Sequence, residues 1–149
     1  MNQDNEFSVP SLMTFQIGAL YGRIHKECDK IFREKAFPLE MDQIPVVLRL
    51  YYKGGASQQE ICSAIHRDKA SVNRTVSFLL KKDIVKVLQD SADKRKTAVT
   101  LTTTGKKLAK QATVILEEFN QMLSSVLTEA ERKQFHSLML KLIGTVTFK

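Results

Sequence analysis

The most constraining feature of the sequence is a pair of helix patterns within residues 57–82 that only a short polar turn separates. Ser57 and Glu60 stand at the start of the first pattern, where each side chain can bind a backbone N–H that the helix leaves free. The first helix is expected over 58–65 and the second over 69–82. A short helix, a turn of three or four residues and a second helix together form a helix-turn-helix.

Two short β-prone segments, 84–88 and 97–101, follow directly. The polar loop between them contains the sequence DKRK at 93–96. Two strands around such a loop predict a β-hairpin. A basic loop tip is usually only a solvated surface, but directly after a helix-turn-helix it is better explained as the wing of a winged-helix fold.

Longer helix patterns flank this region. Apolar side chains at spacings of three and four predict amphipathic helices at both ends of the chain. We therefore expect a mainly α (α+β) fold forming a single unit, 1–149. It would have a winged helix-turn-helix core at 40–110, a two-stranded β-hairpin wing, and long N- and C-terminal dimerisation helices at 11–36 and 111–149. A monomer this thin would expose the apolar stripes of these helices, whereas helices intertwined between two subunits would cover them.

The net charge of the chain is concentrated in one segment. The formal net charge is +7, and residues 56–110 hold 12 Lys and Arg against 5 Asp and Glu, while the rest of the chain holds 11 of each kind. A contiguous basic segment is the footprint of a surface that binds a polyanion such as DNA. Charge alone also fits a mildly basic domain with a solvated face.

The helix expected over 69–82 has two distinct sides. Val72, Val76 and Leu79 would face the core, and the opposite side is small, polar or basic. Such a stripe fits the major groove, where Arg74 can offer a bidentate fork to guanine, while lysines at the helix ends would meet phosphates. A solvated helix face is the alternative. The DNA-contacting residues expected here are Lys69, Ala70, Ser71, Asn73, Arg74, Ser77 and Lys81.

The loop of the hairpin supplies a second expected contact. Arg95 lies between Lys94 and Lys96 at a tip that can project, which suits insertion into a narrow minor groove. Asp93 stands two residues before it and can accept hydrogen bonds from the guanidinium, holding its fork at one angle. We expect Lys94, Arg95 and Lys96 to contact DNA and Asp93 to support the wing.

Residues 57–108 resemble the MarR (multiple antibiotic resistance regulator) family of winged-helix regulators. The sequence DKASVNR at 68–74 resembles the start of the family's recognition helix. The sequence DKR at 93–95 matches its D-x-R wing tip, and LTTTG at 101–105 matches its L-T-x-x-G entry to the fifth helix. One position departs from the pattern. Asp83 stands where the family usually has glycine after the recognition helix, so we expect a cap other than the left-handed glycine type there.

The resemblance implies a two-fold homodimer that reads a near-palindromic operator on double-stranded DNA, commonly as a repressor. Two recognition helices one helical turn apart, about 34 Å, roughly double the base contacts of one. The resemblance also implies a small anionic or aromatic effector. The residues that can line its pocket are His25, Arg49, Tyr51 and Tyr52, although the two tyrosines also suit ordinary packing.

Cys28 is a second candidate for regulation, because some relatives sense hydroperoxides through a first-helix cysteine. A reactive cysteine needs a lowered pKa and access to the oxidant. Cys28 lies on the apolar stripe of its helix with Glu27 and Asp29 adjacent, which does not favour a thiolate. The alternative is a pair of free structural thiols at Cys28 and Cys62, as expected in a reducing cytosol.

Other classes of function find little support. The sequence contains no glycine-rich phosphate loop, metal-binding motif or nucleophile elbow, so we expect no enzymatic activity, cofactor or metal. No stretch approaches the roughly 20 apolar residues of a membrane span, and the N-terminus lacks a signal-peptide pattern. We expect a cytoplasmic protein without a membrane partner. The remaining rival is a protein-interaction adaptor that kept the winged-helix shape and lost DNA binding.

Overall fold

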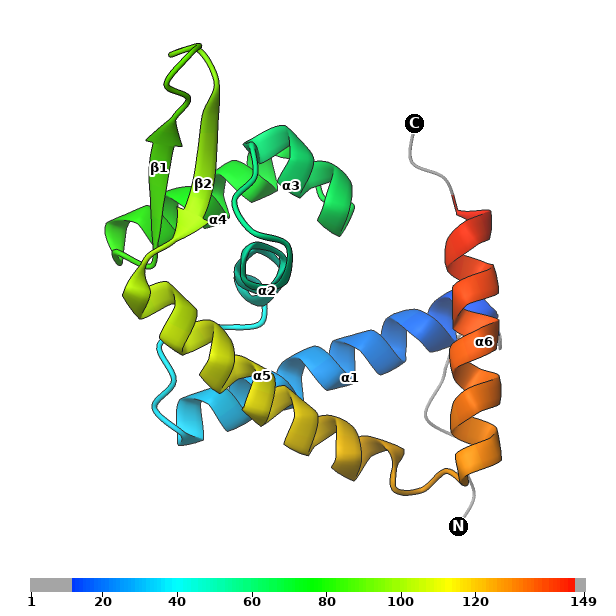
Figure 1. Cartoon of the computed structure of the whole chain (residues 1–149). Coiled ribbons are helices and arrows are strands. Elements are labelled where there is room, and N and C mark those ends of the chain that lie inside the picture. Colours follow the sequence, from blue (N-terminus) through cyan, green and yellow to red (C-terminus); the bar gives the residue numbers. More distant parts are fainter. Residues whose placement is uncertain (1–11, 147–149) are drawn as a thin grey trace. The chain divides into compact units, whose positions relative to one another are not determined.

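The computed structural model describes residues 12–146, which form six helices and two strands (Figure 1). The fold is mainly helical with one two-stranded antiparallel sheet, so the predicted fold class is confirmed. The expected ranges 11–36 and 111–149 include residues 11 and 147–149, which lie outside the described part. In chain order the elements are α1 (Met13–Glu34), α2 (Ile44–Lys53), α3 (Gln58–Ile65), α4 (Lys69–Lys81), β1 (Val85–Gln89), β2 (Thr97–Leu101), α5 (Thr103–Ser124) and α6 (Glu129–Thr145).

The chain divides into two compact units between Met41 and Asp42. The first contains α1, which ends at Glu34 because the backbone turns left-handed at Ala36, with φ 52°. The Asp29 carboxylate accepts the N–H of Met41 at 2.7 Å. The segment after α1 is therefore tied back to the helix. The expected division into a 40–110 core and dimerisation helices stays a prediction.

The second unit builds its core from short elements that each contribute a few buried side chains. The capping box expected at Ser57 and Glu60 is present, and both of its hydrogen bonds open α3. α2 packs against α3, α4, α5 and β2, so it lies at the centre of this core. The fully buried side chains include Val46, Val47, Ile61, Val72, Leu79 and Val85.

The hairpin extends from the end of this unit that also carries α3 and α4 (Figure 1). Its register pairs Val85 with Leu101 and Gln89 with Thr97. Ala56, just before α3, exchanges two backbone hydrogen bonds with Val99 on β2. The base of the hairpin is therefore fixed to the helix-turn-helix, while the outer residues of β1 are exposed.

The end of α4 differs from the expectation. Asp83 has φ 55°, and α4 ends in a Schellman motif in which Ile84 N–H binds the Leu79 carbonyl at 2.9 Å and Asp83 N–H binds that of Leu80 at 3.1 Å. The prediction of a cap other than the left-handed type was therefore wrong. Aspartate tolerates the left-handed region better than most side chains, so it takes the glycine position without changing the cap.

Candidate nucleic-acid interface

The N-terminus of α4 is capped by the side chain of Asp68. Asp68 Oδ1 accepts the N–H of Ser71 at 2.8 Å, and this bond to the backbone lowers the pKa of the Asp68 carboxyl. A cap here satisfies a backbone donor that the first turn would leave free. α4 therefore begins at Lys69, the residue at which the sequence predicted its start.

The two sides of α4 are separated as the helical periodicity predicted. Val72, Val76 and Leu79 are buried, and Thr75 joins them on the inner side. The opposite side is open to solvent, except that Ser71 is half-buried. The exposed members of the expected contact set on α4 are Lys69, Ala70, Asn73, Arg74, Ser77 and Lys81.

Arg67, in the turn between α3 and α4, has a role that the sequence analysis missed. Its Nη1 donates to the backbone carbonyl of Asp42 at 2.7 Å, and its side chain is only 22% exposed. The turn before α4 is thus fixed to the segment that leads into α2. Arg67 and Arg74 both line a hollow of ≈ 510 Å³ beside the first turns of α4. No sequence signal could reveal this contact, because the partner is a backbone carbonyl 25 residues away.

The wing loop is organised by two aspartates. Asp90 Oδ1 accepts the N–H groups of Asp93 at 3.0 Å and Ala92 at 2.7 Å, and these bonds lower the pKa of Asp90. Backbone bonds between Asp90 and Lys96 and between Lys96 and Asp93, each 2.9 Å, close the loop. Asp90 was not predicted, although an aspartate before a turn is a known turn former.

Asp93 supports the wing by a different bond from the one expected. Its Oδ1 accepts the backbone N–H of Arg95 at 3.0 Å, and no bond to the guanidinium is present among the described residues. The expectation that Asp93 orients the guanidinium fork was therefore wrong. A carboxylate two residues before an N–H closes an Asx turn with little entropy loss, so the backbone donor is preferred over a long side chain. Lys94, Arg95 and Lys96 are all exposed.

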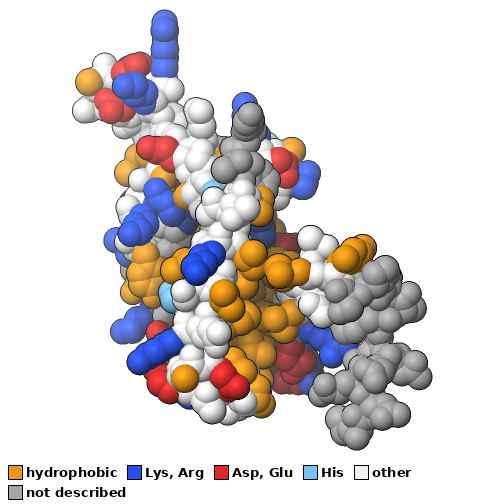
Figure 2. Space-filling view, turned by 90° about the vertical axis from the view of Figure 1, so that its right-hand side faces the viewer, with side chains coloured by type: hydrophobic (Ala, Val, Ile, Leu, Met, Phe, Trp, Pro, Cys, Tyr) orange, Lys and Arg blue, Asp and Glu red, His pale blue; other side chains and the backbone are white. Residues whose placement is uncertain are grey.

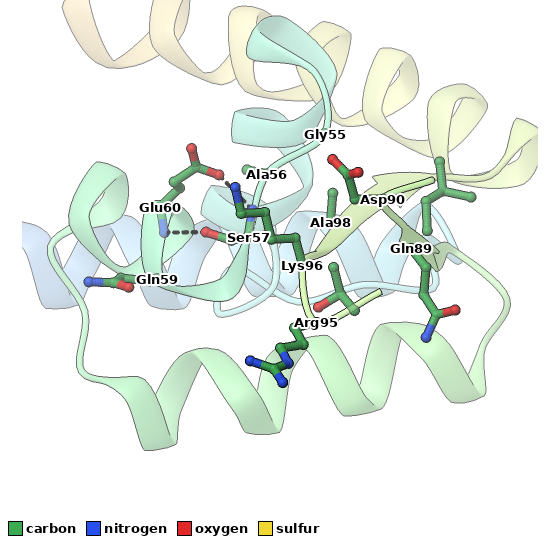
Figure 3. A pocket seen from close by; sticks show the side chains of 12 residues that line it. Gly55, Ala56, Ser57, Gln59, Glu60, Gln89, Asp90, Arg95, Lys96 and Ala98 are labelled. Atoms are coloured by element: carbon green, nitrogen blue, oxygen red, sulfur yellow. Dashed lines mark hydrogen bonds between the residues drawn. The ribbon is translucent and has the colours of Figure 1, made fainter. Parts of the chain in front are cut away.

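A hollow of ≈ 610 Å³ separates the wing from the start of α3 (Figure 3). Lys96 is directed toward the Ser57–Glu60 capping box, and Arg95 points to the other side of the hollow. The hydrogen bonds of the capping box lower the pKa of Glu60, so this carboxylate stays charged at neutral pH. The hollow is therefore bordered by two cations of the wing, Arg95 and Lys96, and by two carboxylates, Glu60 and Asp90.

The residues expected to line an effector pocket have other partners in the chain. Arg49 Nη1 donates to the carbonyl of Gly54 at 3.2 Å, and Tyr52 Oη lies 3.1 Å from Thr113 Oγ1 on α5. Tyr51 and Tyr52 form an edge-to-face pair with ring centroids 5.1 Å apart. These three residues share the end of α2. His25 lies in the other unit, with its Nδ1 3.2 Å from Asp29 Oδ2.

Both cysteines are free thiols. Cys28 is buried, and its burial raises the pKa of the thiol, as do the charges of Asp29 and Glu27. These effects work against the thiolate that a peroxide sensor needs. Cys62 is half-buried on α3.

No group of three or more His, Cys, Asp and Glu side chains is placed to hold a metal ion within residues 12–146. None of the described helices combines the length and the apolar character that a membrane crossing requires.

Comparisons with known proteins agree with this fold. The family model of MarR matches residues 39–97. A MarR/EmrR family transcriptional regulator from Acinetobacter sp. ADP1 is 30% identical, with a TM-score of 0.81 over 89% of this chain and 92% of that one. BilQ of Clostridium symbiosum (strain WAL-14163), an HTH-type transcriptional regulator, is 29% identical over 85% of this chain and 90% of its own length.

A third relative is a DNA-binding protein that a small molecule regulates. BpsR of Bordetella bronchiseptica, whose DNA binding is regulated by 6-hydroxynicotinic acid, is 29% identical with a TM-score of 0.70 over 85% of this chain and 98% of that one. These relatives are regulators and not enzymes. With its winged helix-turn-helix and a full-length likeness to a known member, this chain belongs to the MarR family of transcriptional regulators.

Proposed function

We propose that the protein binds double-stranded DNA sequence-specifically, with α4 in the major groove and the wing in the adjacent minor groove. The observation that carries this proposal is the exposure of Arg74 on α4 and of Arg95 on the wing of the same compact unit. Arg74 would read base edges, whereas Arg95 would enter the minor groove. Lys and Arg side chains extend from the hairpin at the top of the view in Figure 2.

The hollow between the wing and α3 supports this docking. A helix and a wing in neighbouring grooves have one sugar-phosphate backbone between them. Arg95 and Lys96 border the hollow, and neither forms an ion pair within the described residues. Cations in this position would bind phosphates and so fix the register of the protein on the duplex.

We further propose that the protein acts as a homodimer on a near-palindromic operator. No residue of α6 is buried, and its apolar side chains lie at the surface, with Phe135 and Leu138 each 49% exposed (Figure 2 faces the side where α6 lies). Contiguous exposed apolar surface of this kind marks an interaction site. A second copy would cover it through a two-fold axis and bring two recognition helices onto one face of the duplex.

Repression and a small-molecule effector complete the proposal. A dimer that covers its operator excludes other proteins from it, so we infer a repressor that works in the cytoplasm, as the likeness to the MarR family implies. The regulation of BpsR by 6-hydroxynicotinic acid makes small aromatic acids the first compounds to test as effectors. His25, Arg49, Tyr51 and Tyr52 remain the residues proposed for that pocket.

Selection of bound sequences from a random duplex pool, followed by a salt titration, tests DNA binding. We expect a two-fold-symmetric site whose affinity falls steeply as salt rises, because each neutralised phosphate releases counterions. An adaptor without DNA binding would select no sequence. A protein that binds all duplexes equally would contradict sequence-specific regulation.

Two arginine variants test the assigned roles. Arg95→Ala should weaken binding to all duplexes, and Arg74→Ala should also relax the base preference, each costing about 1–3 kcal/mol. Lys30→Ala is the charge-matched control, because Lys30 lies on α1 near Glu27 and Glu34, outside the basic segment. If all three variants bind the selected site like the parent protein, the assignment of Arg74 and Arg95 is wrong.

A further inference from the structure

The end of α4 and the start of α5 meet at one threonine. The Thr102 hydroxyl donates to the carbonyl of Asp83 at 2.7 Å, and it accepts the N–H of Gly105 at 3.0 Å as the N-cap of α5. The backbone N–H of Thr102 also binds the carbonyl of Ile84 at 3.0 Å. We call these four residues, Asp83, Ile84, Thr102 and Gly105, the α4–α5 joint.

The joint is closely packed. A Cβ placed on Gly105 would lie 2.0 Å from the carbonyl oxygen of Ile84. Such a contact is impossible without a shift of the backbone, so only glycine allows α5 to approach the α4–β1 turn this closely. The first turn of α5 therefore rests directly on the backbone that ends α4.

The α4 side of the joint has a defined geometry as well. Asp83 is held left-handed by the two Schellman hydrogen bonds, and this conformation fixes the direction of its carbonyl. Thr102 is the side chain that binds this carbonyl, and the same hydroxyl caps α5. A single hydroxyl, with one proton to donate and lone pairs to accept, thus connects the last turn of α4 to the first turn of α5.

We propose that Thr102 is a positioning residue that sets the direction of α4 relative to α5, and through it the separation of the two recognition helices in the dimer. This inference rests on the homodimeric DNA binding proposed above. The pivot lies at the C-terminal end of α4, whereas base contacts of a recognition helix come mainly from its N-terminal end.

α4 is long enough for a small rotation at the joint to displace its N-terminal end by about one base pair. α4 has 13 residues, which corresponds to a length of roughly 20 Å. A change of about 10° at the joint would displace the N-terminal end of α4 by about 3.5 Å, close to the rise of one base pair, about 3.4 Å. Two copies in a dimer would displace both recognition helices. If the joint becomes more flexible at Thr102, the separation of the two recognition helices is therefore no longer fixed.

Three variants isolate the hydroxyl. Thr102→Val removes every hydrogen bond of the hydroxyl, including a second contact of 3.1 Å with the carbonyl of Ile84, at nearly constant volume, and Thr102→Ser restores them. Thr128→Val is the matched control, because Thr128 is the N-cap of α6 and its hydroxyl likewise accepts an N–H, that of Glu131 at 3.2 Å, without a bond to α4. The affinity of each variant is measured for the selected operator and for operators with one base pair added to or removed from the spacer.

The parent protein, Thr102→Ser and Thr128→Val should each bind the altered spacers at least about tenfold more weakly than the selected one. Thr102→Val should lose about fivefold in affinity for the selected spacing, because α4 is no longer fixed in one direction, and should discriminate spacers by less than about threefold. Amide hydrogen exchange at residues 83–85 should be faster in Thr102→Val alone, and this readout needs no DNA.

Each other outcome overturns a different statement. If Thr102→Val keeps the spacer discrimination of the parent protein, or if Thr128→Val loses it equally, Thr102 does not position α4 and only stabilises a helix start. If the parent protein itself selects no operator, the proposed function fails and the positioning role fails with it. Unchanged amide exchange in Thr102→Val would show that the joint is held by packing alone.

Discussion

α4 and α6 both begin with a side-chain cap and carry a stripe of apolar residues, yet their burial is opposite. α4 buries Val72, Thr75, Val76 and Leu79 in the core of its own chain and exposes a polar and basic side. α6 buries no residue, and three of the five residues of its apolar stripe, Phe135, Leu138 and Ile143, are exposed. The stripe comprises Phe135, Leu138, Met139, Leu142 and Ile143.

The difference shows that an apolar stripe predicts a buried face without saying which surface buries it. α2 and the hairpin complete the core around α4 within one chain. The stripe of α6 has no such cover among the described residues. Each half-exposed leucine or phenylalanine still has apolar area to bury, at about 25 cal/mol per Å². The predictions below ask whether α4 depends on its own chain and α6 on a second one.

The largest expected effect is that of Gly105→Ala, which would break the core around α4. The new Cβ would lie 2.0 Å from the Ile84 carbonyl oxygen, so the backbone must shift. We expect the free energy of unfolding to fall by about 3 kcal/mol, measured by urea denaturation.

Gly144→Ala is the control for this change, because a Cβ at that position of α6 meets no atom within 4 Å. It should raise the free energy of unfolding by about 0.5–1 kcal/mol, since alanine favours the helix. Equal destabilisation by both substitutions would contradict the difference between the two helices, because it would mean that Gly144 is as closely packed as Gly105.

Leu138→Asp should weaken the homodimer without unfolding the core around α4. A charge in the centre of the covered stripe would be desolvated in each subunit, so the dimer dissociation constant should rise about 100-fold, or about 2.7 kcal/mol. Sedimentation equilibrium measures this constant, and circular dichroism reports the helix content. Ser137→Asp, with the same charge on the opposite side of α6, should leave the constant within about threefold of the parent value. A Leu138→Asp protein that stays dimeric would show that another surface forms the dimer.

Local signals in the sequence predicted most of the elements. The capping box of Ser57 and Glu60 lies within three residues of the groups it binds, so a short pattern identifies it. The hairpin followed from two β-prone runs around a polar loop, and its pairing of Gln89 with Thr97 closes that loop. In each case the partners are close in sequence, which is why a pattern is sufficient.

The features that the sequence analysis missed or misassigned depend on the folded backbone. Arg67 binds a carbonyl 25 residues away, and such a contact exists only after the core has formed. Asp93 binds the backbone N–H of Arg95, whereas the sequence analysis had assigned it the guanidinium of the same residue. Asp83 takes a left-handed conformation that aspartate tolerates but that the sequence alone does not predict. The DNA-contacting residues were predicted from exposure and charge, and they stay a prediction.

Asp83→Gly, at the end of α4, should change the free energy of unfolding by a smaller amount. Glycine has no Cβ penalty at φ 55°, so the free energy of unfolding should rise by about 0.5 kcal/mol. Asp83→Ala should lower it by about 1 kcal/mol, because alanine is strained in the left-handed region. Thermal unfolding of the three proteins measures both changes. Destabilisation by Asp83→Gly as large as that by Asp83→Ala would show that the carboxylate, and not the backbone, decides this position.

The smallest expected effect concerns the capping boxes of α3 and α6. Glu60 on α3 and Glu131 on α6 each accept a backbone N–H at 2.7 Å, of Ser57 and Thr128 respectively, and these bonds lower the pKa of both carboxyls. Because the pKa is lower in the folded than in the unfolded state, each box stabilises its helix above the ordinary glutamate value of about 4.3. That stabilisation is lost as the pH falls through the lowered pKa.

The two helices should respond differently to this loss. α3 stays anchored by Ile61, which is fully buried, whereas the first turn of α6 has no buried side chain to hold it. In the monomeric Leu138→Asp variant, the protection factor for amide exchange should therefore fall in the first turn of α6 at acid pH while the first turn of α3 stays protected. Glu131→Gln, which cannot ionise, should remove the pH dependence in α6 alone. Equal opening of both first turns at the same pH would mean that packing within the chain does not protect α3.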